Sequence, residues 1–318
     1  DKACEHPDKA CHGESCPLAQ GFYDRLAAAR EAAVRASSLD QQSLRTIALA
    51  HQVCPYYLSQ DLVRWSDVVV GDYNYYFDTS AMLYGLTVEN DWRTAVLVDE
   101  AHNMVERARK MYSAELTQSS FRVARKSAPK SLRTVLDRVN RLWNDLYRDQ
   151  ETEYAVYHAI AEKFLFALQQ AGTDITDLMT DEPDSVSPEL QRFYFDAMQF
   201  SKLAEVFGEH SMFDITRSMS LASKPQATLC IRNIVPAPFL KQRFTTAHTV
   251  TLFSATLGPH HFYADMLGLP DDTAWVDVES PFHAQQLAVR IASTISTRYQ
   301  HRPRSVCLLY TSPSPRDS

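Results

Sequence analysis

The segment 94–102, TAVLVDEAH, places a short apolar run directly before two carboxylates and a histidine. An apolar run without polar alternation is typical of a strand in a parallel sheet that is covered on both faces. Parallel strands need long connections, which are usually helices. The segment therefore favours an α/β fold with a parallel sheet, and it places Asp99, Glu100 and His102 at the carboxyl end of a strand.

These three residues have the chemistry of a nucleotide-hydrolysing site. A carboxylate at the end of a buried strand can hold Mg²⁺, often through water, and a second one can polarise the attacking water. Asp99 would take the first role and Glu100 the second, while His102 would sense the γ-phosphate. Alternatively, the two carboxylates only cap the following helix. The four-residue pattern Asp-Glu-Ala-His is more specific than an acidic pair and favours the nucleotide site.

A second strand-like segment, 248–257, HTVTLFSATL, ends in two hydroxyl side chains. Ser254 and Thr256 would lie at the end of this strand, where their hydroxyls could form a hydrogen bond with His102. The two segments therefore predict a shared site that the chain assembles from positions about 150 residues apart.

The rest of the 318 residues alternates in character, and the chain is long enough for two domains or for one domain with insertions. Helical patterns occupy 22–36, 43–53 and the start of the segment CPYYLSQDLV, and DVVVGDY at 67–73 predicts a buried strand. Residues 103 to about 210 are predicted to be helical, with amphipathic helices in 131–149, 153–172 and 188–210. Strands return at 227–235 and 248–257. This order predicts an α/β core that carries a large helical insertion.

Four of the six cysteines, Cys4, Cys11, Cys16 and Cys54, lie in the first 54 residues. Because a cytosolic compartment keeps thiols reduced, they indicate a metal or iron–sulfur site rather than disulfides. Their irregular spacing is equally compatible with zinc and with [4Fe–4S], and His6, His12 or His51 could replace a thiolate in a zinc site. Cys230, in an apolar strand, and Cys307, near the C-terminus, are not expected to take part.

The net charge of −7 argues against a generally basic nucleic-acid coat. The charge is uneven, however: residues 103–150 carry 11 Lys and Arg against 5 Asp and Glu, and residues 151–210 carry 3 against 12. Two interpretations fit this distribution: the basic stretch forms a face that meets a polyanion, or both stretches are solvated helix surfaces. The candidate phosphate contacts are Arg107, Arg109, Lys110, Arg122, Arg125 and Lys126, and the candidate stacking or strand contacts are Tyr73, Asn74, Tyr75 and Tyr76.

Together these motifs resemble a known family. Asp99-Glu100-Ala101-His102 is similar to motif II of superfamily 2 helicases, and Ser254-Ala255-Thr256 is similar to motif III. The cysteines, with CPYYLSQDLVRWSDVVVGDYNYYFD joining them to motif II, resemble the XPD/DinG-like iron–sulfur DNA helicases. The resemblance covers residues 1–305 and includes ESPF (279–282), which is similar to the segment that leads into the second motor domain.

The resemblance implies a RecA-like motor domain with two insertions. Its expected parts are a cluster domain (1–60), motor domain 1 with motif II (61–105), a helical arch (106–225), motor domain 1 with motif III (226–282) and the start of motor domain 2 (283–306). It implies a [4Fe–4S] cluster on Cys4, Cys11, Cys16 and Cys54, Mg²⁺ on Asp99, and ATP as substrate. The family moves 5′ to 3′ on single-stranded DNA and separates duplexes. Single-stranded and forked DNA are therefore the expected partners, in DNA repair or a related process.

Other features of the sequence limit these expectations. No G-x-x-x-x-G-K-[ST] motif occurs, so the phosphate-binding loop is expected upstream of Asp1, and the second motor domain is expected to be cut off soon after Arg290. Residues 307–318, CLLYTSPSPRDS, look like a non-native tail. The chain by itself is predicted not to hydrolyse ATP. Without a signal peptide or membrane span it is expected to be cytoplasmic (nucleoid-associated if bacterial), and a monomer is expected.

Two other functions remain open from the residues alone. One is a non-catalytic nucleic-acid-binding module that keeps the metal or iron–sulfur site but has no motor. The other is an α/β protein held together by zinc, with no role on DNA.

Overall fold

The computed structural model describes residues 4–7, 9, 11, 13–182, 185–219, 225–286, 288 and 298. The chain divides into two compact units, residues 1–270 and 271–318. In its described residues the second unit has one short 3-10 helix, η5 (Ala284–Gln286). The predicted start of motor domain 2 (283–306) falls mostly outside the described residues, and the predicted tail (307–318) falls wholly outside them.

Three helices near the N-terminus surround a small apolar core, as their sequence patterns predict. They are α1 (Phe22–Val34), α2 (Gln41–Ala50) and α3 (Pro55–Leu62). The core consists of Leu26, Ala29, Ala33, Ala48, Val53, Leu58 and Leu62. The guanidinium of Arg30 donates two hydrogen bonds to Asp61, at 2.7 and 3.0 Å, and so ties α1 to α3.

The prediction of a buried strand in the next segment is wrong. Residues 67–73, DVVVGDY, do not form a strand, and Val68 and Val70 are 79% and 94% exposed. The chain instead runs through η1 (Val63–Trp65) and on to α4 (Asn74–Phe77) and α5 (Met82–Glu89). A strand is stable only when a neighbouring strand satisfies its backbone, and no described strand pairs with this segment.

A parallel pair of strands confirms the α/β class. β1 (Ala95–Val98) pairs with β6 (Thr249–Leu252), with Ala95 opposite Thr249 and Val98 opposite Leu252. The helices η2 (Ala101–Asn103), α6 (Met104–Met111), α11 (Ala237–Thr246) and α12 (His260–Leu267) belong to this part. Val98, Met104, Leu240 and Leu267 are among its core residues. Leu97, on the opposite face of β1, is 71% exposed, so the expected cover on both faces is absent from the described residues.

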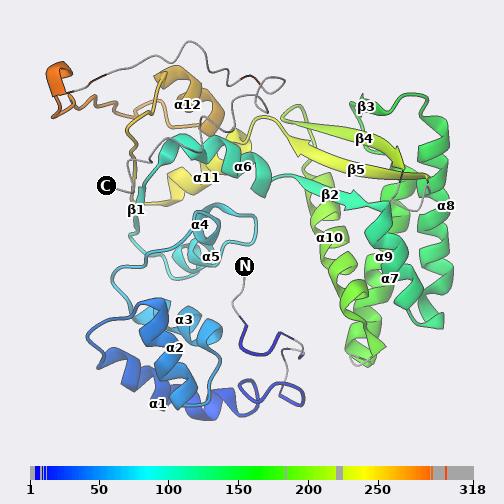
Figure 1. Cartoon of the computed structure of the whole chain (residues 1–318), viewed down its shortest axis with the longest axis horizontal. Coiled ribbons are helices and arrows are strands. Elements are labelled where there is room, and N and C mark those ends of the chain that lie inside the picture. The colour runs from blue at the N-terminus through cyan, green and yellow to red at the C-terminus, as the bar shows by residue number, and fades with distance from the viewer. Residues whose placement is uncertain are drawn as a thin grey trace. The chain divides into compact units, whose positions relative to one another are not determined.

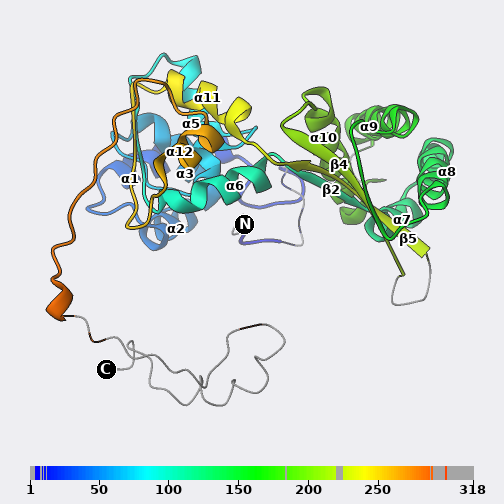
Figure 2. The same ribbon diagram turned by 90° about the horizontal axis from the view of Figure 1, so that it is seen from above.

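Between β1 and β6 the chain builds a second layered structure. Its antiparallel sheet has the order β2 (Ala114–Thr117), β5 (Pro225–Asn233), β4 (Ser211–Met219), β3 (Tyr154–Tyr157). Long helices gather on one side of this sheet (Figures 1 and 2). They are α7 (Gln118–Ser127), α8 (Arg133–Asp149), α9 (Glu162–Asp181) and α10 (Pro188–Glu205), and η3 (Lys130–Leu132) leads into α8.

The core of this insert explains its layering. Alternate residues of the strands, such as Leu116, Phe213 and Leu229, point into the same cluster as Trp143 and Phe164 of α8 and α9. The indole N–H of Trp143 donates to the backbone oxygen of Ala227 at 3.1 Å, so one side chain both fills the core and joins α8 to β5.

The sheet corrects the prediction that residues 103–210 are all helical. The predicted helix over 153–172 begins only at Glu162, because Tyr154–Tyr157 pairs with β4 as an edge strand. The strand-like segment at 227–235 also belongs here: β5 pairs with β4 and β2, not with β1. The insert's sheet therefore extends to Asn233, beyond the expected boundary at residue 225. Sequence periodicity identifies a strand but does not say which sheet it will join.

No helix of the described residues is long and apolar enough to cross a lipid bilayer.

Candidate nucleotide site and cysteine pocket

Asp99 and Glu100 leave the end of β1 in a sharply turned backbone. Glu100 has φ 50° and ψ 41°, a left-handed conformation that costs a side-chain-bearing residue about 1–3 kcal/mol. The backbone N–H of Glu100 donates to Oδ1 of Asp99 at 2.7 Å. The Glu100 side chain is largely exposed. The turn therefore fixes one carboxylate through its neighbour's backbone and presents the other to solvent.

Tyr73 holds this turn from outside. Its hydroxyl donates to the backbone oxygens of Asp99 and Glu100, the latter at 3.0 Å. Burial raises the pKa of Tyr73, so the phenol keeps the proton that it donates. Arg107 lies over the tyrosine ring, 5.5 Å from its centre, and pairs with Asp72 at 3.2 Å. Tyr73, which precedes β1, thus holds the turn at Asp99 and Glu100, and Arg107 of α6 in turn holds the tyrosine ring.

His102 and Ser254 meet at the ends of the two parallel strands. Nδ1 of His102 is 2.8 Å from Oγ of Ser254 and 3.2 Å from Oε2 of Glu100. Backbone bonds continue the strand pairing to this point: Phe253 donates to Val98 at 3.0 Å, and Ala101 donates to Phe253 at 3.1 Å. The parallel register therefore brings together residues separated by 152 positions.

Thr256 has a different place from that expected. Its backbone N–H donates to Oγ of Ser254 at 3.3 Å, while no hydrogen bond from its hydroxyl to His102 occurs in the described part of the chain. Only one of the two predicted hydroxyls thus contacts the histidine. Thr256 supports Ser254 through its backbone.

The residues at this site fit a magnesium ion that shares its ligands with water and phosphate. Mg²⁺ takes oxygen ligands and is usually held by one or two carboxylates plus substrate phosphates. Asp99 and Glu100 provide such oxygens. Within the described ranges, no three His, Cys, Asp or Glu side chains are grouped closely enough to hold an ion unaided. Water and phosphate oxygens would have to complete the coordination.

The four N-terminal cysteines line one pocket, together with Glu5, His6, Leu18, Ala19 and Tyr57. Cys54 lies at the start of α3, where Pro55 begins the helix, and so has a fixed position. Arg45 of α2 donates to both carboxylate oxygens of Glu5, at 2.6 and 2.7 Å, which ties the segment bearing Cys4 to α2. Hydrogen bonding to Arg45 also lowers the pKa of Glu5.

Two kinds of metal site are compatible with four thiols in one pocket. A tetrahedral zinc ion has Zn–S distances of about 2.3 Å, so four sulfurs would converge on it. A [4Fe–4S] cluster is a larger body, and its thiolates surround it. The four cysteines line the same pocket, and their thiolates would suit either group.

The other candidate ligands differ in their position relative to this pocket. His6 lines it, His51 is not among its lining residues, and His12 lies outside the described residues. Cys230 is buried in β5, where burial raises the pKa of its thiol to about 12. A thiol with so high a pKa is a poor metal ligand, and its location agrees with its exclusion from the site.

The tyrosines that were expected to contact DNA have different environments. Tyr76 is buried in the core beneath β1, Tyr73 contacts the motif II turn, and Tyr75 is partly exposed. Tyr76 therefore packs in the core and is not available to stack on a base. Sequence reasoning missed the bond from Tyr73 to the turn, since only its position next to a predicted strand hinted at proximity.

Residues 1–121 match the model of the DEAD_2 family. The match covers less than half of the chain. The match contains the four pocket cysteines and Asp99–His102, and it confirms the resemblance to XPD-like superfamily 2 helicases.

Curated relatives of this chain carry helicase names. The Regulator of telomere elongation helicase 1 homolog of Anopheles gambiae is 29% identical over 151 residues, which is 43% of this chain and 15% of the relative. Regulator of telomere elongation helicase 1 of Bos taurus is 35% identical over 80 residues, 25% of this chain and 6% of the relative. These matches thus span a small part of each relative's length. Among solved structures, an XPD helicase covers 72% of this chain and 39% of its own, at 19% identity and a TM-score of 0.47.

Proposed function

We propose that this chain is part of an ATP-dependent DNA helicase that moves 5′ to 3′ on single-stranded DNA and separates duplexes. The observation that carries the proposal is the contact between His102 and Ser254 at the ends of paired parallel strands, next to Asp99 and Glu100. The DEAD_2 match over residues 1–121 supports the family. The expected partners are ATP and single-stranded or forked DNA, and the expected setting is DNA repair.

Each residue of the site has a proposed role in phosphoryl transfer. Asp99 would hold Mg²⁺, which when bound neutralises charge on the phosphates of ATP. Glu100 would orient the attacking water and accept a hydrogen bond from it. His102 would carry the change in the nucleotide site to Ser254, and so to β6. In this way cleavage of ATP would alter the pairing between two strands that enclose the whole insert.

The cysteine pocket is proposed to hold a [4Fe–4S] cluster. The ligands would be Cys4, Cys11, Cys16 and Cys54, which line one pocket beside a small helical core. Bound there, the cluster would fix the N-terminal segment to α3 by four bonds. Its proposed role is structural, because the core of α1–α3 has only seven residues.

The test of the helicase proposal is Glu100→Gln in the longest gene product that contains this chain. The amide cannot accept a proton from water, so ATP turnover should fall by roughly 10²-fold or more while ATP binding persists. Steady-state phosphate release and equilibrium binding of a fluorescent ATP analogue measure the two quantities. Glu106→Gln, an exposed carboxylate in α6 that pairs with Arg109, is the matched control. Unchanged turnover in Glu100→Gln would remove Glu100 from the site.

The alternative is a non-catalytic nucleic-acid-binding module, and the 318 residues contain no G-x-x-x-x-G-K-[ST] motif. The chain alone is expected to bind single-stranded DNA but to release no phosphate in a single-turnover assay with excess protein. Phosphate release in that assay would show that this chain hydrolyses ATP without such a motif. If a gene product with a phosphate-binding loop also fails to hydrolyse ATP, the binding-module function is the correct one.

A further inference from the structure

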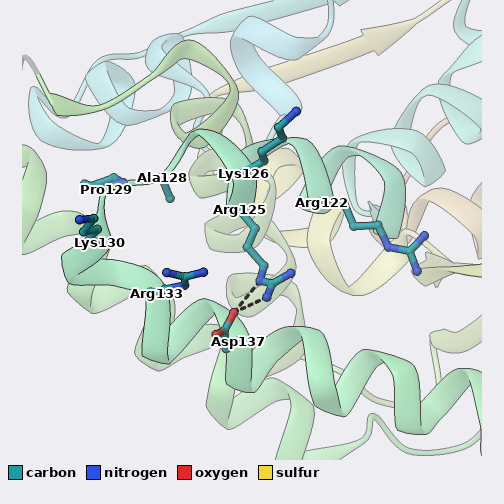
Figure 3. A pocket seen from close by; sticks show the side chains of 8 residues that line it. All are labelled: Arg122, Arg125, Lys126, Ala128, Pro129, Lys130, Arg133 and Asp137. Atoms are coloured by element: carbon teal, nitrogen blue, oxygen red, sulfur yellow. Dashed lines mark hydrogen bonds and ion pairs between the residues drawn. The ribbon is translucent and has the colours of Figure 1, made fainter.

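A basic pocket lies in the insert, within the helical segments that follow β2 and away from the Asp99 turn in sequence. It has a volume of about 380 Å³ and is lined by Arg122, Arg125, Lys126, Ala128, Pro129, Lys130, Arg133 and Asp137. Figure 3 shows these side chains on the end of α7, the loop after it and the start of α8. Five cations and one carboxylate line the same hollow.

Two of the five cations are already engaged by the protein. Arg125 pairs with Asp137, with its Nε 2.7 Å and its Nη2 2.5 Å from Oδ1 (Figure 3). Arg122 donates to the backbone oxygen of Pro225 at 2.8 Å. For Lys126, Lys130 and Arg133, no ion pair occurs among the described residues. The pocket therefore keeps an excess of positive charge that a ligand would have to balance.

The positions of Lys130 and Arg133 indicate that the excess positive charge of the pocket serves an anionic ligand rather than the helix. Arg125 and Lys126 lie in the last turn of α7, where the helix dipole favours cations. Lys130 instead begins η3, which leads into α8, and Arg133 is the first residue of α8, a 17-residue helix with no acidic residue in its first turn. The dipole favours anions there, so these two cations oppose the stability of the helix. A bound anion would reverse this effect, because it is attracted by both the helix and the side chains.

The lining also indicates which part of a nucleic acid would bind. It contains no aromatic side chain on which a base could stack, and its neutral residues are Ala128 and Pro129. Contacts of cations to phosphate position a strand without reading its sequence. A pocket of this volume is within the range of small-ligand sites, roughly 300–1,000 Å³, and so has room for more than one phosphate group.

We propose that this pocket binds adjacent backbone phosphates of single-stranded DNA, independently of base sequence, through Lys126, Lys130 and Arg133. The choice of DNA rests on the proposed helicase function, and the pocket adds a contact on the insert itself. Asp137 limits the affinity because it occupies Arg125. The insert would thus grip the strand at a point distinct from the nucleotide site.

The test compares double variants of the whole chain by fluorescence anisotropy with labelled oligo-dT and oligo-dA over a range of salt. Lys130→Gln/Arg133→Gln should weaken binding about 10-fold near 0.1 M salt and reduce the slope of log K against log salt by about 1.4, equally for both oligonucleotides. Lys163→Gln/Lys202→Gln removes the same charge from exposed sites on α9 and α10, and it should leave the slope unchanged. Asp137→Asn should tighten binding by freeing Arg125.

The thermal unfolding of each variant separates binding from folding. Lys130→Gln/Arg133→Gln should be at least as stable as the parent, since it removes two cations from a helix N-terminus. An equal loss of DNA affinity in both double variants, or no loss in either, would contradict the proposal that the pocket binds DNA. Titration with tripolyphosphate tests whether the pocket binds a free polyphosphate instead of a DNA backbone. If tripolyphosphate binding depends on Lys130 and Arg133 while DNA binding does not, the proposal is wrong.

The same binding experiment distinguishes failure of the pocket proposal from failure of the proposed DNA-binding function. If the parent chain binds oligonucleotides and the pocket variants bind equally well, the pocket proposal fails and DNA binding stands. If the parent chain binds no single-stranded DNA under any salt condition, the DNA-binding part of the proposed function fails with it.

Discussion

At the scale of single residues, the site depends on one strained turn. Glu100 adopts a left-handed backbone, and the hydroxyl of Tyr73 donates to the backbone oxygens of both Asp99 and Glu100. A phenol is a rigid group whose ring is fixed here by Arg107. Tyr73 therefore acts as a positioning residue for the two carboxylates and touches neither of them with its hydroxyl.

Replacing Tyr73 by Phe tests this role. The variant keeps the ring and loses a hydrogen bond with a net value of about 0.5–1.5 kcal/mol, so kcat for ATP in the complete gene product should fall by up to about 10-fold. KM for ATP should change less than kcat, because the lost bond positions the turn that carries Glu100, whose proposed role is to orient the attacking water. Tyr75→Phe, which alters a partly exposed neighbour, is the control. Equal kcat values in the two variants would contradict the positioning role.

At the scale of elements, α8 is the centre of the insert. Its Trp143 is fully buried, stacks on Phe121 with ring centres 5.3 Å apart and meets the edge of Phe164 at 5.2 Å. Helices α7 and α9 and strand β5 thus converge on a single side chain. The helical spacing of Val135, Leu136, Val139 and Trp143 makes this face predictable, and all four are buried.

Trp143→Ala should lower the free energy of unfolding of the insert by about 3–5 kcal/mol, because it leaves a cavity under β5. Trp143→Phe should cost less, mainly through the unpaired oxygen of Ala227, about 1–3 kcal/mol. Urea unfolding followed by far-ultraviolet circular dichroism measures both changes. Trp65→Ala, at an exposed site, should have a much smaller effect. Similar losses at Trp65 and Trp143 would show that the insert's core is not centred on α8.

At the scale of the molecule, the described residues of the first unit form three apolar cores. One belongs to α1–α3, one to the parallel pair and its helices, and one to the insert. The first is much the smallest, and the four pocket cysteines adjoin it. Small domains with few buried residues usually need a metal or disulfide to be stable. Stability is therefore expected to be uneven, with α1–α3 dependent on the occupant of the cysteine pocket.

Cys54→Ser should abolish iron binding and the broad visible absorption of a [4Fe–4S] protein purified without oxygen. Hydrogen exchange should then accelerate in α1–α3 and stay slow in the insert, whose core is separate. Cys230→Ser is the control, because Cys230 lies in β5 outside the pocket. A colourless parent protein that contains one zinc ion per chain would contradict the cluster assignment.

The sequence was informative where a pattern is local. Helices α1, α2, α8 and α10 follow from apolar spacing, and Asp99 and Ser254 follow from polar residues placed directly after strand-like runs. Sequence-based predictions failed where the structure of a segment depends on another segment that pairs with it. Val68–Val70 has strand-forming residues but no described strand to pair with, and β5 joins a sheet that its own sequence does not specify. Tyr73 and Thr256 were ambiguous for the same reason, since their contacts come from distant segments.

The points at which the chain leaves and re-enters the parallel pair lie side by side. The backbone N–H of Asn233 donates to the hydroxyl of Ser113 at 2.9 Å, and β2 and β5 pair directly beyond this bond. A segment whose two ends meet can be exchanged or removed with little effect on its host, because a short turn can replace it. The insert is thus a natural unit for transplantation, because recombination at two adjacent points would exchange the whole insert and leave the parallel pair in place.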